Sequence, residues 1–362
     1  MAPVTIWLGC PLTNMRSTIS LPHFQITERD VSLRESDLLP MLVTGVAGVA
    51  GYNAFSWFRQ KYGDAVSGQR PVNNWPLSAP GIFGVDLDTV EVTREFIRQH
   101  QFKSVVNCGG SCRLKGCELD PKMAQRVNVS SVNSLLAAIE PDTRFVHLSI
   151  DLVYSGTKGG GHVESDSTDP VTVYGNTMVQ AEQAILAQNP DACILRISLP
   201  MGVSFNGHAG AIDWIQARFA AGKPATLYYD EVRTPTYVEC LNEVIEEVLC
   251  GDLSGIYHAG GSVKLSLYEI AQIVNKVGGY DPDLLMGCPR IDAGPIPPRA
   301  GNVTMDSTAL AKQLQRSPFL PWPLDSQLIP DSRDWHYERD QSDGSIERIR
   351  NQLYFRPLKP DF

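Results

Sequence analysis

The segment Thr44–Gly51 carries the clearest chemical pattern in this 362-residue chain, TGxxGxxG. It follows the apolar run 38–44 and precedes residues 52–62, which have the pattern of a helix. Glycines permit a tight turn and close backbone approach, and the following helix offers free N–H groups and a positive dipole end to an anion. The pattern therefore predicts a pyrophosphate-binding loop, with a purely structural glycine turn as the alternative. The residues expected to line it are Gly45, Gly48, Val49, Ala50 and Gly51.

Arg70 follows the second expected strand, Asp64–Ser67. An acidic residue usually stands near this place and holds a ribose 2′-hydroxyl. A guanidinium there can instead pair with a 2′-phosphate, which favours NADP over NAD, with NAD still possible. The alternative is that Arg70 is a solvated surface residue.

Two cations, Arg113 and Lys115, lie in the loop expected after the third strand. If both side chains point inward, they suit an anionic substrate; otherwise they are solvated loop charges. Cys108, Cys112 and Cys117 cluster in the same region, but their spacings match neither zinc nor iron–sulfur patterns. We therefore expect free thiols and no metal site.

Short apolar strands alternate with helical segments in the first part of the chain. Further strands are expected at 104–107, 145–149 and 193–198, and helices at 90–101, 121–139 and 177–188. This alternation predicts an α/β fold, a Rossmann-type doubly wound parallel sheet with ligands beyond the carboxyl ends of its strands. Beyond residue 200 the alternation weakens, which indicates a smaller C-terminal substrate lobe. The expected organisation is an N-terminal extension (1–37), an NAD(P)-binding domain (38–200), mainly a substrate-binding lobe (201–315) and an irregular tail (316–362).

Composition limits the classes of partner. Hydrophobic residues make up 43% of the chain and the net charge is −9, which argues against a nucleic-acid partner and gives no reason to expect a membrane surface. The first residues lack the regions of a signal peptide, and no apolar run approaches the ~20 residues of a membrane span. We expect a cytoplasmic protein with a small-molecule substrate. The terminal segments allow either homo-oligomerisation or capping of a pocket.

Several segments, taken in order, resemble the extended short-chain dehydrogenase/reductases, and within them the dTDP-4-dehydrorhamnose reductase-like proteins. They are the glycine loop, Asp86-Leu87, 107–110, Arg126-Val127-Asn128, 149–156, 174–178, Arg196, 233–238 and 255–258. The resemblance implies that Asp86 and Leu87 lie by the adenine. It also implies that Cys108, Gly109 and Gly110 pass under the pyrophosphate and nicotinamide ribose, and that Ile150 and Arg233 face the substrate, often a nucleotide sugar.

The chain departs from this family at its working residues. The family uses a Ser or Thr, a Tyr, and a Lys four residues after the Tyr, where it lowers the pKa of the phenol. Here Tyr174 is present, but Met178 replaces the Lys and Ile150 replaces the Ser or Thr. An unassisted phenol costs roughly 4 kcal/mol to ionise at pH 7. Asp151 and Ser149 are candidate substitutes, and Lys115 is another cation that could approach the pocket.

Three functions remain open from the sequence. The first is an atypical NADP-linked oxidoreductase, either a reductase or a redox-neutral epimerase or dehydratase, with Tyr174 donating a proton to a carbonyl-bearing small molecule such as a modified sugar. The second is a non-catalytic cofactor-binding subunit, as the methionine adenosyltransferase beta subunit is in this family. The third is a new, non-redox chemistry on the same fold, carried by Asp151, Lys115 or a cysteine.

Overall fold

A parallel sheet forms the centre of the protein, whose computed structural model describes residues 37–72, 77–207, 209–339 and 344–354. Its seven strands lie in the order β11-β6-β5-β4-β1-β2-β3, and every neighbouring pair is parallel. Their bounds are β1 (Met41–Thr44), β2 (Val66–Arg70), β3 (Ile82–Gly84), β4 (Ser104–Asn107), β5 (Arg144–Ile150), β6 (Cys193–Ile197) and β11 (Gly255–Ala259). The order 3-2-1-4-5-6 within this sheet is that of the doubly wound Rossmann fold, so the predicted fold class is confirmed.

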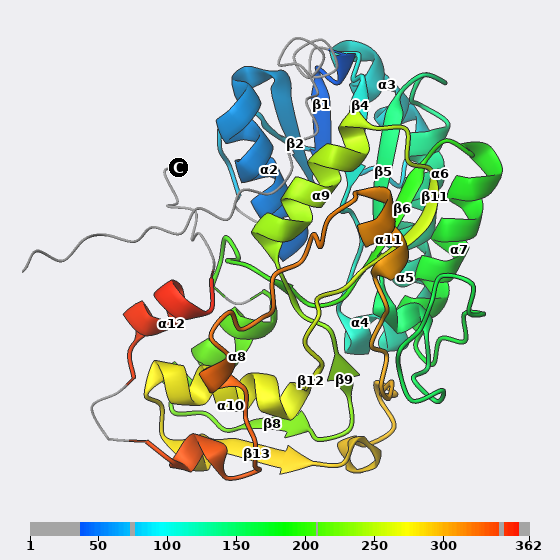
Figure 1. Cartoon of the computed structure of the whole chain (residues 1–362). Helices are drawn as coiled ribbons and strands as arrows, with labels where there is room; N and C mark the ends of the chain where they lie inside the picture. Colours follow the sequence, from blue (N-terminus) through cyan, green and yellow to red (C-terminus); the bar gives the residue numbers. More distant parts are fainter. Residues whose placement is uncertain (1–36, 73–76, 208, 340–343, 355–362) are drawn as a thin grey trace, which may run out of the picture.

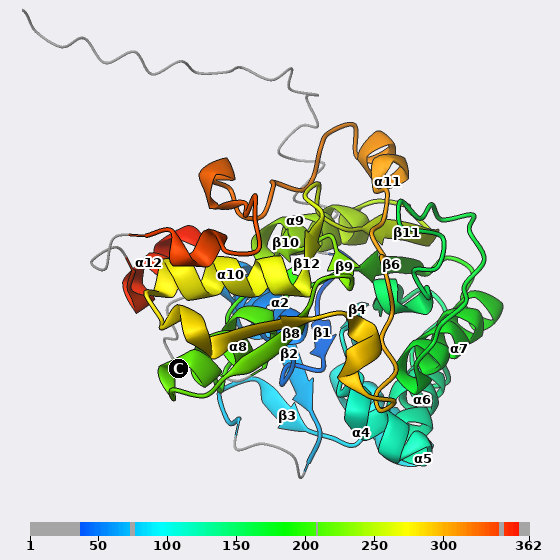
Figure 2. The ribbon, with the colours of Figure 1, turned by 90° about the horizontal axis from the view of Figure 1, so that it is seen from below.

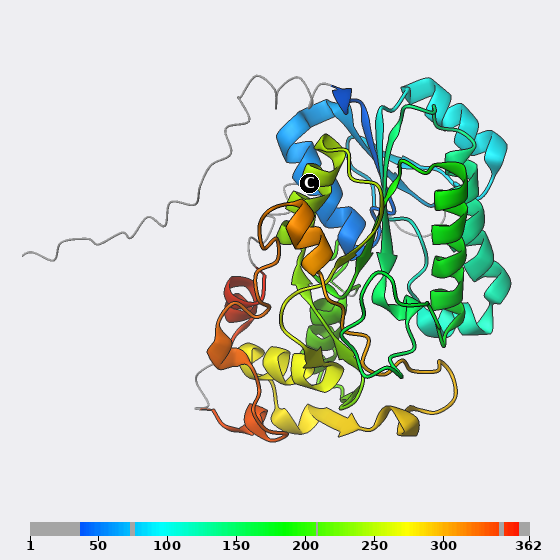
Figure 3. The ribbon, with the colours of Figure 1, turned by 45° about the vertical axis from the view of Figure 1, so that its right-hand side comes forward.

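Helices cover both faces of the sheet (Figure 3). One face carries α2 (Val49–Tyr62) and α9 (Val238–Cys250), and the other carries α3 (Val90–His100), α6 (Ser131–Leu136) and α7 (Val173–Gln188). Two hydrophobic cores result: one lies between the sheet and α3, α6 and α7, and the larger one includes α2 and α9, reaches the start of α7 and continues into the C-terminal lobe. The central strands β1, β4, β5 and β6 are therefore buried on both sides, which accounts for their short apolar sequences.

The order of the strands reverses between β1 and β4. The loops after these two strands diverge to opposite faces at this point, and doubly wound folds bind ligands in the crevice that forms there. The glycine loop follows β1, and residues 108–110 follow β4. The two segments predicted to hold a cofactor thus meet at the switch point.

The lobe built mainly from residues after 200 lies beyond the carboxyl ends of the strands (Figures 1 and 2). It contains α8 (Ala211–Ala220), α10 (Leu267–Gly278) and the parallel pair β8 (Ala225–Tyr228) and β13 (Leu285–Cys288). Two short pairs join it to the sheet region: β7 (Pro200–Met201) with β10 (Thr236–Tyr237), and β9 (Val232–Arg233) with β12 (Leu265–Ser266). The chain does not stay in this lobe after residue 200, because α9 and β11 return to the sheet.

Local structure differs from the expectation in the region 114–139. The loop expected there contains α4 (Leu114–Leu119), and the single helix expected over 121–139 is divided into α5 (Pro121–Gln125), a π-helical turn (Arg126–Ser130) and α6. Inside that turn, Asn128 accepts a hydrogen bond from the Ser111 N–H at 2.6 Å and donates one to the Thr177 hydroxyl at 2.8 Å. These contacts tie the turn to the β4 loop and to α7, and π-helical turns often occur beside functional sites.

The tail after Arg316 is largely irregular, as expected, but it is anchored. Trp322 is fully buried and its indole N–H donates to the Leu353 carbonyl at 3.0 Å. The short helix α12 (Ile346–Gln352) packs against α10. Only residue 37 of the expected N-terminal extension lies within the described residues. No helix in the described ranges is long and apolar enough to cross a membrane.

Candidate functional site

The glycine loop is packed so tightly that no residue larger than glycine fits at two of its positions. Gly45 has φ +66°, and a Cβ on it would lie 2.4 Å from the Cys108 carbonyl oxygen. A Cβ on Gly51 would lie 2.3 Å from the Gly45 carbonyl oxygen. Gly48 is the N-cap of α2, and the first turn of that helix holds no acidic side chain. The loop therefore presents helix N–H groups without a competing carboxylate, which suits an anionic ligand.

The β4 loop lies directly beside this turn. The Thr44 hydroxyl donates to the Asn107 side chain at 2.6 Å and accepts from the Gly109 N–H at 3.1 Å. Gly110 adopts φ +147°, which only glycine accepts readily. The structure thus brings Cys108, Gly109 and Gly110 next to the glycine loop.

The residues predicted for the adenosine end have defined partners. Arg70 donates to the Pro71 carbonyl at 3.0 Å and to the Val72 carbonyl at 3.2 Å, and its Nε donates to the Leu77 carbonyl. Asp86 accepts from the Val72 N–H at 2.9 Å, whereas Leu87 is buried in the hydrophobic core. Arg70 and Asp86 thus organise the loop after β2.

Gln69 was not identified from the sequence. Its side-chain oxygen accepts from the Gly45 N–H at 3.1 Å, and its amide donates to the Val85 carbonyl at 2.5 Å. It therefore links the glycine loop to the segment after β3. Its signal in the sequence is its place at the end of β2, where the family's acidic residue is missing.

Tyr174 lies in the first turn of α7. Thr172 caps this helix by accepting from the Gly175 N–H at 2.9 Å, which fixes where the turn begins. The Tyr174 side chain is only 8% exposed, and within the described ranges its hydroxyl has no hydrogen-bond partner. Burial is the largest cause that raises the pKa of the phenol above its ordinary value, and the Cys112 and Asp151 groups raise it further, while Arg233 opposes them. The phenol is therefore neutral at physiological pH.

The positions where the family carries a Lys and a Ser or Thr are apolar. Met178 stands one helical turn after Tyr174 and is buried, and Ile150 ends β5 and is also buried. Neither supplies a charge or a hydroxyl, so the groups that act on Tyr174 must come from elsewhere.

Asp151 and Arg233 form a buried ion pair beside Tyr174. The guanidinium donates to both carboxylate oxygens at 2.7 Å, and the Ser198 hydroxyl donates to the same carboxylate at 2.6 Å. Asp151 is 0% and Arg233 3% exposed. Burial raises the pKa of the Asp151 carboxyl, against the opposing effects of Arg233 and Ser198. A residue predicted as catalytic and one predicted to bind substrate are thus joined directly.

Glu231 and Arg299 extend this pair and were missed by the sequence reasoning. Glu231 is 1% exposed, and one carboxylate oxygen lies 3.3 Å from an Arg233 nitrogen while the other lies 3.6 Å from an Arg299 nitrogen. The Arg299 guanidinium also lies over the Tyr228 ring, 4.7 Å from its centroid. Charged residues in loops are mostly solvated, so a sequence gives no direct signal for such a buried group.

Ser149, the third predicted catalytic residue, lies in a different buried network. Its hydroxyl donates to Glu182 of α7, and Glu182 accepts from two nitrogens of Arg196 at 2.9 and 2.7 Å. Arg196 donates to the Tyr154 hydroxyl at 2.6 Å, and that hydroxyl also contacts His258 Nε2 at 2.9 Å. The Ser149 hydroxyl therefore contacts α7, whereas Asp151 contacts Arg233.

Arg113 and Lys115 lie at the start of α4, and both are exposed. Cys112 beside them is also exposed, yet burial of its thiol raises its pKa. Of the cysteines in the described ranges none is in a disulfide, and there no cluster of three or more His, Cys, Asp or Glu side chains could hold a metal ion.

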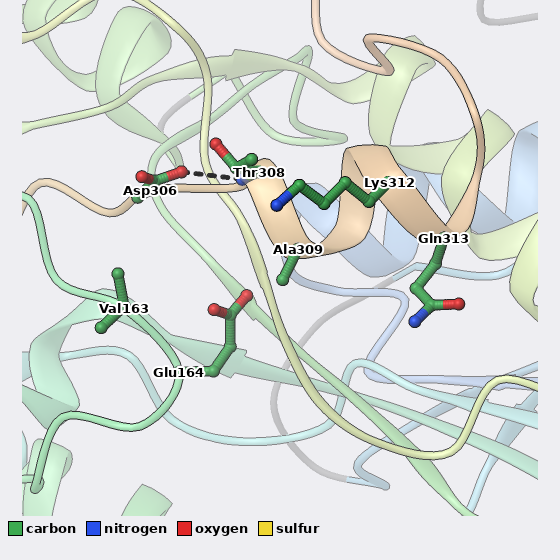
Figure 4. A pocket seen from close by; sticks show the side chains of 7 residues that line it. All are labelled: Val163, Glu164, Asp306, Thr308, Ala309, Lys312 and Gln313. Atoms are coloured by element: carbon green, nitrogen blue, oxygen red, sulfur yellow. Dashed lines mark hydrogen bonds between the residues drawn. The ribbon is translucent and has the colours of Figure 1, made fainter.

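A pocket of about 390 Å³ lies apart from these residues, beside α11 (Thr308–Gln313). Glu164 and Lys312 extend into it from opposite sides (Figure 4). It is lined by Val163, Glu164, Asp306, Thr308, Ala309, Lys312 and Gln313. None of the predicted site residues is among them.

Known proteins with similar sequences and solved structures with a similar fold both include sugar-nucleotide reductases. A probable low-salt glycan biosynthesis reductase of Haloferax volcanii is 28% identical over 250 residues, which cover 67% of this chain and 81% of that protein. Methionine adenosyltransferase 2 subunit beta of Rattus norvegicus is 25% identical, with 68% of this chain and 73% of that protein covered. The crystal structure of dTDP-4-dehydrorhamnose reductase from Bacillus anthracis in complex with NADP has a TM-score of 0.65 at 16% identity and covers 78% of this chain and 95% of that one.

The family assignment follows from a match over most of the chain. The model of the RmlD substrate binding domain matches residues 40–323, which include the glycine loop, Tyr174 and the Asp151–Arg233 pair. The seven-stranded sheet and its strand order agree with the fold of the solved relatives. This protein belongs to the RmlD substrate binding domain family.

Proposed function

We propose that this protein is an NADP-dependent reductase that acts on a carbonyl group of a sugar nucleotide or a similar small molecule. The observation that carries the proposal is a neutral, buried Tyr174 beside the Asp151–Arg233 pair, at the sheet edge that also bears the glycine loop. The reductases among the relatives support the same reaction class.

The loops at the switch point fit a dinucleotide. The backbone of Gly45 approaches Cys108 too closely for any side chain, and α2 offers its N–H groups without an acidic neighbour. Arg70 lies at the end of β2; its guanidinium donates to the carbonyls of the following loop, and its charge there supports NADP over NAD. When bound, the cofactor would supply a hydride; the remaining chemistry belongs to the side chains of this chain.

Tyr174 is suited to one direction of that chemistry. Reduction of a carbonyl forms an alkoxide, and a neutral phenol is the form that donates a proton to it. The reverse direction needs the phenolate, which costs more than about 4 kcal/mol at pH 7 for a phenol with a pKa above 10. Because Met178 provides no charge to offset this cost, reduction is favoured over epimerisation, which needs both directions.

Arg299 is the residue best suited to bind an anionic part of the substrate. Its guanidinium is held between the Tyr228 ring and Glu231, and 22% of the side chain is exposed. An arginine whose plane is fixed in this way pairs well with a phosphate. Lys115, exposed on α4, is a second cation for the same purpose.

The test is turnover of NADPH with a keto-sugar nucleotide. We expect the protein to bind NADPH more tightly than NADH and to oxidise it when dTDP-4-dehydrorhamnose is added. Tyr174→Phe should lower turnover by at least about tenfold and leave NADPH binding unchanged, whereas Tyr257→Phe, on a distant strand, should change neither. Unchanged turnover in the Tyr174→Phe variant would refute the role of Tyr174.

A second function is favoured by a specific observation, the apolar residues Met178 and Ile150 in place of the family's Lys and Ser or Thr. One relative with a similar match is named as a subunit of an enzyme. In this alternative, the protein keeps its cofactor loop and acts by binding a partner. NADPH binding without turnover of any keto-sugar, together with a stable complex that changes the activity of a partner enzyme, would support it.

A further inference from the structure

Four charged side chains alternate in sign from Tyr174 into the C-terminal lobe. We call them the charge chain: Asp151, Arg233, Glu231 and Arg299. Asp151 follows β5, Arg233 lies in β9, and Glu231 directly precedes β9. Figure 1 shows β9 between the central sheet and the β8–β13 pair, so the chain of charges crosses the junction between them.

The contacts along the charge chain are unequal. Asp151 holds Arg233 through two hydrogen bonds of 2.7 Å. Glu231 contacts Arg233 at 3.3 Å, and its distance of 3.6 Å to Arg299 is beyond hydrogen-bond range. In the described part of the chain, Glu231 Oε2 and Arg299 Nε are both buried without a hydrogen-bond partner. A buried carboxylate with so few donors is the weakest point of the chain of charges.

The ionised form of Glu231 is stabilised by the two arginines beside it, Arg233 and Arg299. Burial raises the pKa of the Glu231 carboxyl, the charges of Arg233 and Arg299 lower it, and Asp151 raises it again. These are the charged groups that face Glu231 from the elements around it, and Tyr174 is the titratable group next along the chain. Any ligand that neutralises Arg299 therefore removes one of the two charges that keep Glu231 ionised.

We propose that Glu231 is a positioning residue that couples occupancy of the substrate lobe to Tyr174: when an anionic group of the ligand pairs with Arg299, Glu231 takes up a proton. This inference rests on the proposed function, because it deepens the role of Tyr174 as proton donor. The proton comes from solvent and binds one carboxylate oxygen, and no other bond changes.

The consequence for Tyr174 follows from counting charges. In the empty protein the four side chains of the charge chain sum to zero, and a singly charged anion on Arg299 together with a proton on Glu231 leaves the sum at zero. The proton is added nearer to Tyr174 along the charge chain than the anion is, so its effect at the phenol is the larger of the two; it lowers the pKa of the phenol and makes it a better acid once the substrate is bound. A positive charge that the family obtains from its Lys would here come from a solvent proton that Glu231 takes up when the ligand binds.

The experiment is calorimetric titration of the full chain with thymidine diphosphate in two buffers of different ionisation enthalpy. We expect the wild-type protein to take up a fraction of a proton per bound diphosphate. Glu231→Gln, which keeps the shape of the side chain, should bind about fivefold more tightly and take up none. Asp230→Asn is the matched control, since this neighbouring carboxylate contacts Arg290 instead, and it should behave as wild type.

Three results would overturn the proposal: no diphosphate binding to the wild-type protein, binding without proton uptake, or wild-type uptake in the Glu231→Gln variant. The first two need no variant, so they hold even if the substitution disturbs folding. The titration does not involve NADPH oxidation, and its failure therefore leaves the reductase proposal standing. Conversely, proton uptake in a protein that shows no reductase activity would support the role of Glu231 and refute the reductase proposal.

Discussion

Asp151→Asn is the substitution whose effect can be worked out most directly from the structure. The carboxylate is 0% exposed and accepts hydrogen bonds from two Arg233 nitrogens and from Ser198. Asparagine keeps the shape but removes the charge and turns one acceptor into a donor that faces a guanidinium. Breaking a buried ion pair on one side typically costs about 3–5 kcal/mol, and we expect this range for the free energy of unfolding.

Urea denaturation followed by circular dichroism measures that cost, and a double-mutant cycle assigns it. Arg233→Met leaves Asp151 and Glu231 buried without their shared cation, so it should be at least as destabilising. The double variant should be more stable than the sum of the two losses predicts, because neither charge is then left alone. Glu95→Gln removes an exposed ion pair with Arg98 and should leave the midpoint unchanged.

The argument is refuted by a small or additive effect. A loss below about 1 kcal/mol for Asp151→Asn would mean that the pair is solvated or replaced in solution, because only exposed pairs are worth so little. Additive losses in the cycle would mean that Asp151 and Arg233 do not act on each other.

Three further outcomes are expected. Gly51→Ala should abolish NADPH binding, measured by titration, because its Cβ would lie 2.3 Å from a backbone oxygen. Burial lowers the pKa of His147 and of His258 to about 4, so the unfolded state binds protons first as pH falls. Stability measured in urea should therefore be complete above the ordinary histidine pKa and decline as pH falls from about 6.5 towards 4, less steeply in a His258→Asn variant. Cys112 should react slowly with iodoacetamide at pH 7.5, since burial raises its thiol pKa, and bound NADPH should slow the reaction further because we propose that the loop after β4 lies beside the cofactor; equal labelling with and without NADPH would contradict that placement.

The sheet was predictable because its signals are local. Short apolar strands, helical periods and the glycine loop each depend on a few neighbouring residues, and their order in the chain fixes a doubly wound sheet. β3 was not predicted, because its three residues, Ile82–Gly84, are at most half-buried and a strand of three residues is too short to show a period. The break in the helix over 121–139 was not predicted, because the hydrogen-bond partners of Asn128 lie elsewhere in the chain, at Ser111 and Thr177.

The candidate site was predictable only in part, because its partners are distant in sequence. Tyr174 and Asp151 stood out through family resemblance, but nothing in the sequence pairs Asp151 with Arg233, which lies 82 positions away. Glu231 carries no motif, and a carboxylate in a loop is expected to be solvated. Its burial follows from the two short strand pairs that join the lobe to the sheet, and such long-range packing leaves no periodic trace.

The loss of the family's Lys and the presence of the charge chain bear on the same electrostatic problem. A Lys at position 178 would add one positive charge one helical turn from the Tyr174 phenol, at all times. A proton on Glu231 adds a positive charge farther along the charge chain, beyond Asp151 and Arg233, and only while an anion occupies Arg299. Under the proposed coupling, Tyr174 stays a weak acid in the empty protein and becomes a stronger one when the substrate binds. Binding energy from a remote part of the substrate would then be used at the reacting group, which is the condition under which it raises turnover as well as affinity.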